Sequence, residues 1–174
     1  IETYKKVLVL KPDHAKSHIN MGVVLQGQNK LQEAIEAYKK ALLLKPDFAE
    51  AYNNMGNVLK DQGKLKKAIE TYKKALSLKP DLAEAYINMG GALWEQSKME
   101  EAIECYKGAY SINAYNADAY WYLYGTAKNL REAKKWIGKC LKADPNHLEA
   151  KLTLSALQYY EGNETEFNTN MKSS

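Results

Sequence analysis

The spacing of the prolines is the feature that most constrains the fold of this 174-residue chain. Pro12, Pro46 and Pro80 follow one another at equal intervals. Other small and aromatic residues keep the same step: Gly22, Gly56 and Gly90; Ala34, Ala68 and Ala102; Tyr38, Tyr72 and Tyr106; Ala41, Ala75 and Ala109. A fixed period in the range of about 20–50 residues indicates a stack of repeated units, each of which buries its apolar face only against its neighbours.

The second copy shows the pattern most completely. Its motif positions are Tyr52, Met55, Gly56, Leu59, Ala68, Tyr72 and Pro80. They resemble the tetratricopeptide repeat, W-x2-L-G-x2-Y followed by A-x3-F and P, which has the same period of about 34 residues. The resemblance extends over nearly the whole chain and implies an all-α fold. In that fold, an α-solenoid of antiparallel helix pairs (A and B) winds into a right-handed superhelix with a concave groove lined mainly by the A helices.

The resemblance predicts a single array over residues 1–174. Its expected parts are a partial repeat with one B helix (1–12), three full repeats (13–46, 47–80 and 81–114), a shortened irregular repeat (115–145) and a partial C-terminal repeat (146–174). The expected helices are 1–10, 14–27, 31–44, 48–61, 65–78, 82–95, 99–112, 116–127, 130–142, 147–159 and a weak one near 164–171. Because the chain starts without Met and within a repeat, we expect it to be part of a longer protein.

Local signals accompany these helices. Gly63 and Gly162, with Asn29, stand at A-to-B turns, where a left-handed backbone conformation is wanted. The repeated glycines are expected to let each A helix approach the small alanines of its partner, while the repeated tyrosines fill the space between neighbouring repeats. Two pairs have the spacing of capping boxes: Asp47 with Glu50, and Asp81 with Glu84.

The fourth copy breaks the period. The expected proline is Ala114, and the next proline, Pro145, comes three positions too early, so three residues are missing from this copy. In one register Tyr120 takes the slot of Tyr52, and Tyr124 falls in the glycine slot. In the other register Trp121, Tyr124 and Gly125 serve as W-x2-L-G. We favour the first register because it keeps the flanking spacing.

Asparagines recur on the expected A helices. Asn20, Asn54 and Asn88 are each one repeat period apart, in a slot that faces the groove in the resembled fold. A carboxamide offers an acceptor and two donors, so it can pair with both backbone groups of an extended peptide. A comparable ladder occurs in the family's O-linked N-acetylglucosamine transferases. Asn53 and Asn57 would extend the polar strip; alternatively, such asparagines bond within the array.

Three aromatic residues are candidate apolar anchors for a bound peptide: Trp94, Trp121 and Tyr122. The alternative for the fourth copy is structural, since large rings there, including Trp136, can fill the space that a shortened helix leaves. Another known binding mode of the resembled family is the carboxylate clamp, in which Lys and Arg on the groove-facing A helices grip the C-terminus of heat-shock chaperones. Here the corresponding slots hold Glu84, Asp118 and Tyr122, so we reject this mode.

We therefore predict a protein–protein interaction scaffold that binds an extended peptide segment of a protein partner in the groove. One alternative is a non-catalytic recruitment arm of a larger transferase, because the stretch DPNHLEAKLTLSALQYYEGNETEF resembles the closing repeats of bacterial tetratricopeptide proteins that continue into such a domain. Another is self-assembly into a homo-oligomer through uncapped terminal repeats.

Other classes of function have little support. The net charge of +4 comes from dispersed lysines, which argues against nucleic acid, and no apolar run reaches the roughly 20 residues of a membrane span. No nucleophile–base pair or metal-ligand spacing stands out, so we expect neither enzymatic activity nor a cofactor or metal. Cys105 and Cys140 form no disulfide framework, which favours a reducing, cytoplasmic location.

Overall fold

The computed structural model describes residues 14–172, with side chains described up to residue 162. Within this part of the chain it contains nine α-helices and no strand, which confirms the all-α class. The helices are α2 (Ala15–Gly27), α3 (Leu31–Leu44), α4 (Ala49–Asp61), α5 (Leu65–Leu78), α6 (Ala83–Glu95), α7 (Met99–Ile112), α8 (Ala117–Tyr124), α9 (Leu130–Ala143) and α10 (Leu148–Lys172). The predicted helix 1–10 lies outside the described residues.

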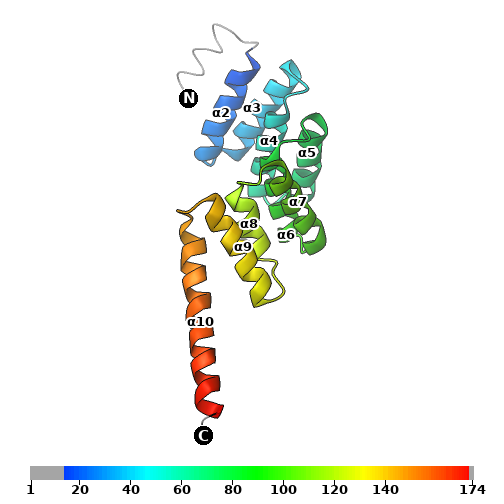
Figure 1. Cartoon of the computed structure of the whole chain (residues 1–174). Helices are drawn as coiled ribbons and strands as arrows, with labels where there is room; N and C mark the ends of the chain where they lie inside the picture. The colour runs from blue at the N-terminus through cyan, green and yellow to red at the C-terminus, as the bar shows by residue number, and fades with distance from the viewer. Residues whose placement is uncertain (1–13, 173–174) are drawn as a thin grey trace. The chain divides into compact units, whose positions relative to one another are not determined.

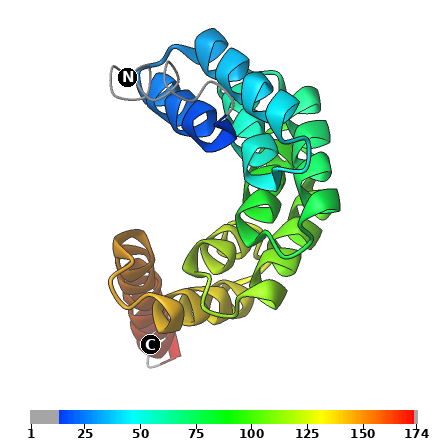
Figure 2. The ribbon, with the colours of Figure 1, turned by 90° about the horizontal axis from the view of Figure 1, so that it is seen from above.

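The chain divides into two compact units, residues 1–108 and 109–174, and the division falls within α7. In unit 1, α2 packs on α3 and α4 packs on α5, as expected for helix pairs (Figure 1). The A helices also touch one another, α2 with α4 and α4 with α6. They therefore form one layer of the unit, with α3 and α5 on its other side (Figure 2). This layer carries the predicted asparagines.

Each pair in unit 1 is held together by a glycine against a tyrosine ring. A Cβ atom on Gly22 would lie 2.6 Å from Cε1 of Tyr38, and one on Gly56 would lie 2.5 Å from Cε1 of Tyr72. The third pair, Gly90 with Tyr106, repeats this arrangement. The close partner of each glycine is thus the tyrosine of its own repeat. The repeated alanines, which are expected opposite the glycines, are fully buried, and the three atoms nearest to each added Cβ all belong to the tyrosine.

Two of the predicted left-handed turns are confirmed, whereas the predicted helix caps are wrong. Asn29 and Gly63 have φ values of 59° and 70°, which confirms the left-handed turns, and Ser97 at 60° is a third that the pattern did not indicate. The capping boxes are wrong, because the N-cap residues are Phe48 and Leu82 and no side chain caps either helix. The first-turn glutamates bond outside their own helices instead, Glu50 of α4 to Lys79 and Glu84 of α6 to Asn53.

The irregular fourth repeat follows the favoured register. Helix α8 begins at Ala117, one repeat period after Ala83, the first residue of α6, and Ala119 is fully buried like its counterparts in α4 and α6. The helix has 8 residues, compared with 13 in α6, and Gly125 lies beyond its end with an exposed surface. The alternative register, with Gly125 as the packing glycine, is therefore wrong.

The shortened helix changes the glycine–tyrosine contact of its pair. The glycine slot of α8 holds Tyr124, and the tyrosine slot of α9 holds Ile137, which is fully buried. The sequence therefore places the larger side chain on helix A and the smaller one on helix B. A tyrosine opposite a second tyrosine would overpack the pair, and the smaller Ile137 reduces this crowding.

The partial repeat at the C-terminus differs most from its prediction. Residues 148–172 form one helix, α10, of 25 residues that extends beyond the ends of α8 and α9 (Figure 1). The predicted turn at Gly162 is absent, and no neighbour lies within 4 Å of a Cβ at that position. An exposed glycine inside a helix costs only about 1 kcal/mol, so it does not end this one. Lys134 of α9 forms an ion pair with Glu161 of α10.

Candidate functional site

The buried asparagine of helix α4 is the centre of a polar chain between repeats. The side chain of Asn53 is 2% exposed. Its Nδ2 donates to Oε1 of Glu84 over 3.1 Å, and its Oδ1 accepts from Nδ2 of Asn88, also over 3.1 Å. Both partners belong to α6, so the chain joins two successive A helices. A buried carboxamide needs such partners, since an unsatisfied one costs about 1–3 kcal/mol.

This geometry corrects the prediction for Asn53 and divides the asparagines by role. Asn53 offers no open surface to a peptide, and it instead fixes the carboxamide of Asn88. The bond to Asn53 uses one N–H of Asn88, which leaves its oxygen and its second N–H. The slot of Asn53 holds Ile19 and Ile87 in the neighbouring copies, so the polar chain is specific to this junction.

Two asparagines of the predicted ladder retain their full hydrogen-bonding capacity. Asn54 and Asn20 are half-buried, and neither side chain forms a hydrogen bond within residues 14–162. Asn54 and Asn88 both lie on A helices of unit 1, one repeat period apart. Asn54 on α4 therefore has all of its side-chain donors and acceptors available, and Asn88 on α6 has all but one N–H.

Asn57 has a structural role. Its Oδ1 accepts a hydrogen bond of 2.7 Å from the hydroxyl of Tyr72, which is fully buried. Burial raises the pKa of Tyr72, and nearby carboxylates add to this effect. Asn57 therefore satisfies the hydroxyl of a tyrosine in the interior of its helix pair.

The first-turn glutamates are occupied within the array. Oε1 of Glu50 lies 2.8 Å from Nζ of Lys79, and this hydrogen bond holds the pKa of Glu50 below its usual range. Glu84 bonds to Asn53, as described above. Glu84 therefore ties one repeat to the next, whereas Glu50 bonds within its own repeat.

The predicted aromatic anchors fall in different units. Trp94 lies on α6 in unit 1 and is 39% exposed. Trp121 and Tyr122 lie on α8 in unit 2. The Trp121 ring stacks on Tyr124 at a centroid distance of 5.1 Å and contacts His147 at 5.2 Å. For Trp121 these contacts favour the structural interpretation, because its ring fills space around the shortened helix. Tyr122 is 43% exposed.

Unit 2 also contains a cluster that the sequence analysis missed. The rings of Tyr110, Tyr120 and Trp136 gather with centroid distances of 5.5–6.2 Å, and Nζ of Lys139 lies 5.2–5.6 Å from all three centroids. The density of aromatic residues in this repeat was a visible signal. Lys139 lies one helical turn after Trp136, and this spacing could have indicated that the lysine contacts the aromatic rings.

The described residues contain no feature that points to catalysis. Cys105 and Cys140 are buried free thiols, and burial raises the pKa of each to about 11, so both are protonated and unreactive near neutral pH. Among the described residues no group of three or more His, Cys, Asp or Glu side chains is placed to hold a metal ion. Within the same part of the chain, every helix is too short or too polar to cross a membrane.

Comparison with known protein families agrees with the geometry. A pattern described as "TPR repeat" matches residues 27–63 and 56–97, and one described as "Tetratricopeptide repeat" matches residues 83–116 and 122–147. Together these matches cover well over half of the chain. The chain belongs to the tetratricopeptide repeat family, whose members are typically non-catalytic scaffolds for protein partners. No curated protein sequence matches it.

Solved structures give a more specific likeness. One described as "Crystal structure of MamA" has a TM-score of 0.71 and 27% identity, with 84% of this chain and 87% of that chain covered. Another, "Crystal structure of MamA protein", has a TM-score of 0.68 and 28% identity, covering 85% and 82%. A third, "MamA RS-1 ArsTM double mutant", has a TM-score of 0.68 but 20% identity, and therefore supports the fold alone.

Proposed function

We propose that this chain is a non-catalytic interaction module that holds an extended peptide segment of a partner protein against the A helices of unit 1. Asn54 and Asn88 bond to the backbone of the peptide, Asn20 extends the row toward the N-terminus, and Trp94 supplies an apolar contact. Asn53 and Glu84 act behind them by fixing Asn88.

The observation that carries this proposal is the hydrogen-bond chain from Glu84 through Asn53 to Asn88. It fixes one carboxamide on α6 while the carboxamide of Asn54 on α4 stays unused. A carboxamide that is held in place loses little conformational entropy when a ligand binds. Bonds to a peptide backbone do not depend on its side chains, so the module should accept extended segments of varied sequence.

The test uses a peptide selected for binding from a random library. Asn54 and Asn88 are replaced together (Asn54→Ala, Asn88→Ala), and the control is Gln32→Ala, which removes an exposed carboxamide from a B helix. With net hydrogen-bond values of about 0.5–1.5 kcal/mol, we expect the double variant to bind about tenfold to a hundredfold more weakly. N-methylation of the peptide backbone should weaken binding more than alanine substitution of its side chains. Equal affinity of the double variant and the wild type would contradict the proposal.

Self-assembly is a second candidate, favoured by one observation. Helix α10 exposes large apolar and aromatic side chains in the described part of unit 2: Leu148 and Leu152 are each 63% exposed, Tyr159 is 69% exposed and Tyr160 is 70% exposed. A repeat array normally covers such a surface with a further helix. Light scattering over a range of concentrations tests this candidate, because a strict monomer at high concentration would exclude it.

We also propose a reducing compartment such as the cytoplasm as the site of action. Cys105 and Cys140 are free and buried, which fits a protein that does not depend on disulfides.

A further inference from the structure

Helix α9 presents three lysines along one face. Lys135, Lys139 and Lys142 are spaced by four and three residues, which places them on the same side of a helix. All three are exposed, and none forms an ion pair with a carboxylate in the portion of the chain with described side chains. Lys134, which precedes Lys135 on the same helix, and Lys79 in unit 1 do have carboxylate partners. This face therefore carries positive charge that the protein does not neutralise.

Aromatic rings hold two of these ammonium groups in place. Nζ of Lys139 lies 5.2 Å from the ring centroid of Trp136, 5.4 Å from that of Tyr120 and 5.6 Å from that of Tyr110. Nζ of Lys135 lies 4.9 Å from the Trp136 centroid. Cation–π contacts within about 6 Å are attractive, so the lysines lie over the rings. An ammonium ordered in this way loses less conformational entropy when it meets an anion.

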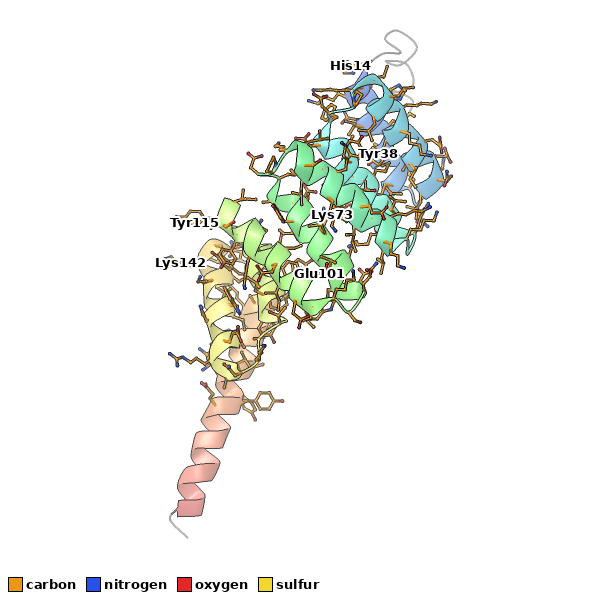
Figure 3. The ribbon with its side chains drawn as sticks, turned by 90° about the vertical axis from the view of Figure 1, so that its right-hand side faces the viewer. His14, Tyr38, Lys73, Glu101, Tyr115 and Lys142 are labelled. Atoms are coloured by element: carbon orange, nitrogen blue, oxygen red, sulfur yellow. The ribbon has the colours of Figure 1, made fainter. Side chains whose placement is uncertain are left out.

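A pocket opens beside Lys139 and Lys142. Its volume is about 230 Å³, and Tyr115 and Lys142 lie at the same edge of unit 2 (Figure 3). Its lining combines two ammonium groups with apolar and aromatic walls: Ala114, Tyr115, Tyr120, Lys139, Lys142 and Ala143. Because pockets for whole small molecules measure about 300–1,000 Å³, this one is sized for a side chain rather than for a complete ligand.

We propose that this lysine pocket is a second docking site, which binds an acidic segment of a partner protein. One Asp or Glu carboxylate enters between Lys139 and Lys142, beside Tyr115, which is 75% exposed. A second carboxylate pairs with Lys135. Four residues of α9 span about 6 Å, which is close to the roughly 6.6 Å between alternate residues of an extended chain. Acidic residues at alternate positions thus match the lysines.

The ring arrangement favours an acidic peptide over a nucleic acid. Single strands bind by stacking successive bases on open aromatic rings. Tyr120 and Trp136 are 6% and 7% exposed, and their faces are used by one another and by Lys139. Only Tyr115 has a widely exposed ring at this pocket. The site therefore lacks the row of open rings that bases would need.

The proposal is tested by binding of a defined probe, a fluorescent, end-blocked heptapeptide of alternating Glu and Leu. The pocket variant is Lys139→Gln, Lys142→Gln. The matched control is Lys73→Gln, Lys74→Gln, which removes two exposed charges from α5 of unit 1. We expect the pocket variant to bind about tenfold more weakly and the control to bind like the wild type. Added salt should weaken binding to the wild type.

Three results would overturn the proposal: equal loss of affinity in the control variant, equal binding of a peptide with Gln in place of every Glu, or tighter binding of an oligothymidine that depends on the same two lysines. If the pocket variant has a lowered melting temperature, the amide resonances of the wild type decide the question. Addition of the acidic peptide should then shift Tyr115, Tyr120 and Lys142, and unchanged resonances there would refute the site. Neither readout involves Asn54 or Asn88, so failure of this proposal would leave the function proposed for unit 1 unaffected.

Discussion

Gly56 and Tyr72 are matched across their helix pair: a Cβ atom added to Gly56 would lie 2.5 Å from Cε1 of the ring, nearer than real Cβ contacts allow. The ring has no room to move, because Tyr72 is fully buried and its hydroxyl bonds to Asn57 over 2.7 Å. The same glycine–tyrosine contact occurs in the other two repeats of unit 1. Because a side chain in the glycine slot would push the two helices apart, the glycines are needed to hold the A helices, and the asparagines on them, in their positions.

The first prediction follows from this contact. Gly56→Ala should lower the free energy of unfolding by about 1–3 kcal/mol, since an overpacked site must shift its backbone or its ring. Gly91→Ala is the matched control, because a Cβ there meets nothing within 4 Å in a helix of the same unit. The control should be stabilised by up to about 1 kcal/mol through helix propensity. Urea denaturation measures both changes, and equal effects of the two substitutions would contradict the packing described here.

The second prediction concerns the hydroxyl of Tyr38. It is buried and has no hydrogen-bond partner among the described residues, whereas the hydroxyl of Tyr72 has Asn57. The slot of Asn57 holds Val23 in the first repeat. Val23→Asn should supply the missing acceptor and raise the free energy of unfolding by about 0.5–1.5 kcal/mol. The gain should vanish in a Tyr38→Phe background; a gain that persists there would mean that the new bond is not its cause.

The third prediction is a loss of stability at alkaline pH. Burial raises the pKa of Cys105 and of Cys140 from about 9 to about 11, and that of Tyr38 from 10.0 to about 12. Above pH 9 these groups ionise in the unfolded chain before they do so in the folded protein. The unfolded state then binds fewer protons, so the free energy of unfolding falls as the pH rises from about 9 toward 12.

Urea midpoints at pH 8, 9, 10 and 11, measured with reductant present, test this expectation. Replacement of both cysteines by Ala should flatten the part of the decline between pH 9 and 11, and this size change suits Cys140, whose slot holds Ala75 in the second repeat. A midpoint in the wild type that stays constant up to pH 11 would show that the thiols titrate normally.

The fourth prediction separates folding from binding at the asparagine chain. Asn53→Ile places in α4 the residue that occupies the same slot in the neighbouring copies, Ile19 and Ile87. Because Glu84 is exposed and Asn88 is half-buried, water can replace the lost bonds, and we expect stability to change by less than about 1 kcal/mol. Affinity for the selected peptide should fall severalfold, because Asn88 is no longer fixed. Unchanged affinity would remove the positioning role of Asn53.

The repeat period predicted most of the helices because each repeat supplies its own landmarks. Helices α3, α5 and α7 have the predicted bounds, and α4 begins at Ala49, one residue after the predicted start. The pattern failed where its landmarks were missing. Residues 146–174 contain neither the repeated alanines of a B helix nor a proline, and Gly162 alone could not show whether a turn or a continuous helix follows.

The functional side chains were less predictable for a geometric reason. Neighbouring residues on a helix point about 100° apart, so Asn53 and Asn54 look alike in sequence although one is buried between α4 and α6. Their roles depend on how the next repeat packs. The lysine pocket depends in the same way on Tyr110, Tyr120 and Trp136, which come from three different helices. A spacing rule within one repeat does not predict contacts between side chains of different helices.

The most direct test of the central proposal is a nitrogen-15 NMR titration of the side-chain amide groups with the selected peptide. The carboxamide signals of Asn54 and Asn88 should shift as the peptide binds, while the exposed Gln32 on helix α3 should not change. If the peptide saturates the protein and the signals of Asn54 and Asn88 stay where they were, the A-helix face of unit 1 is not the peptide site.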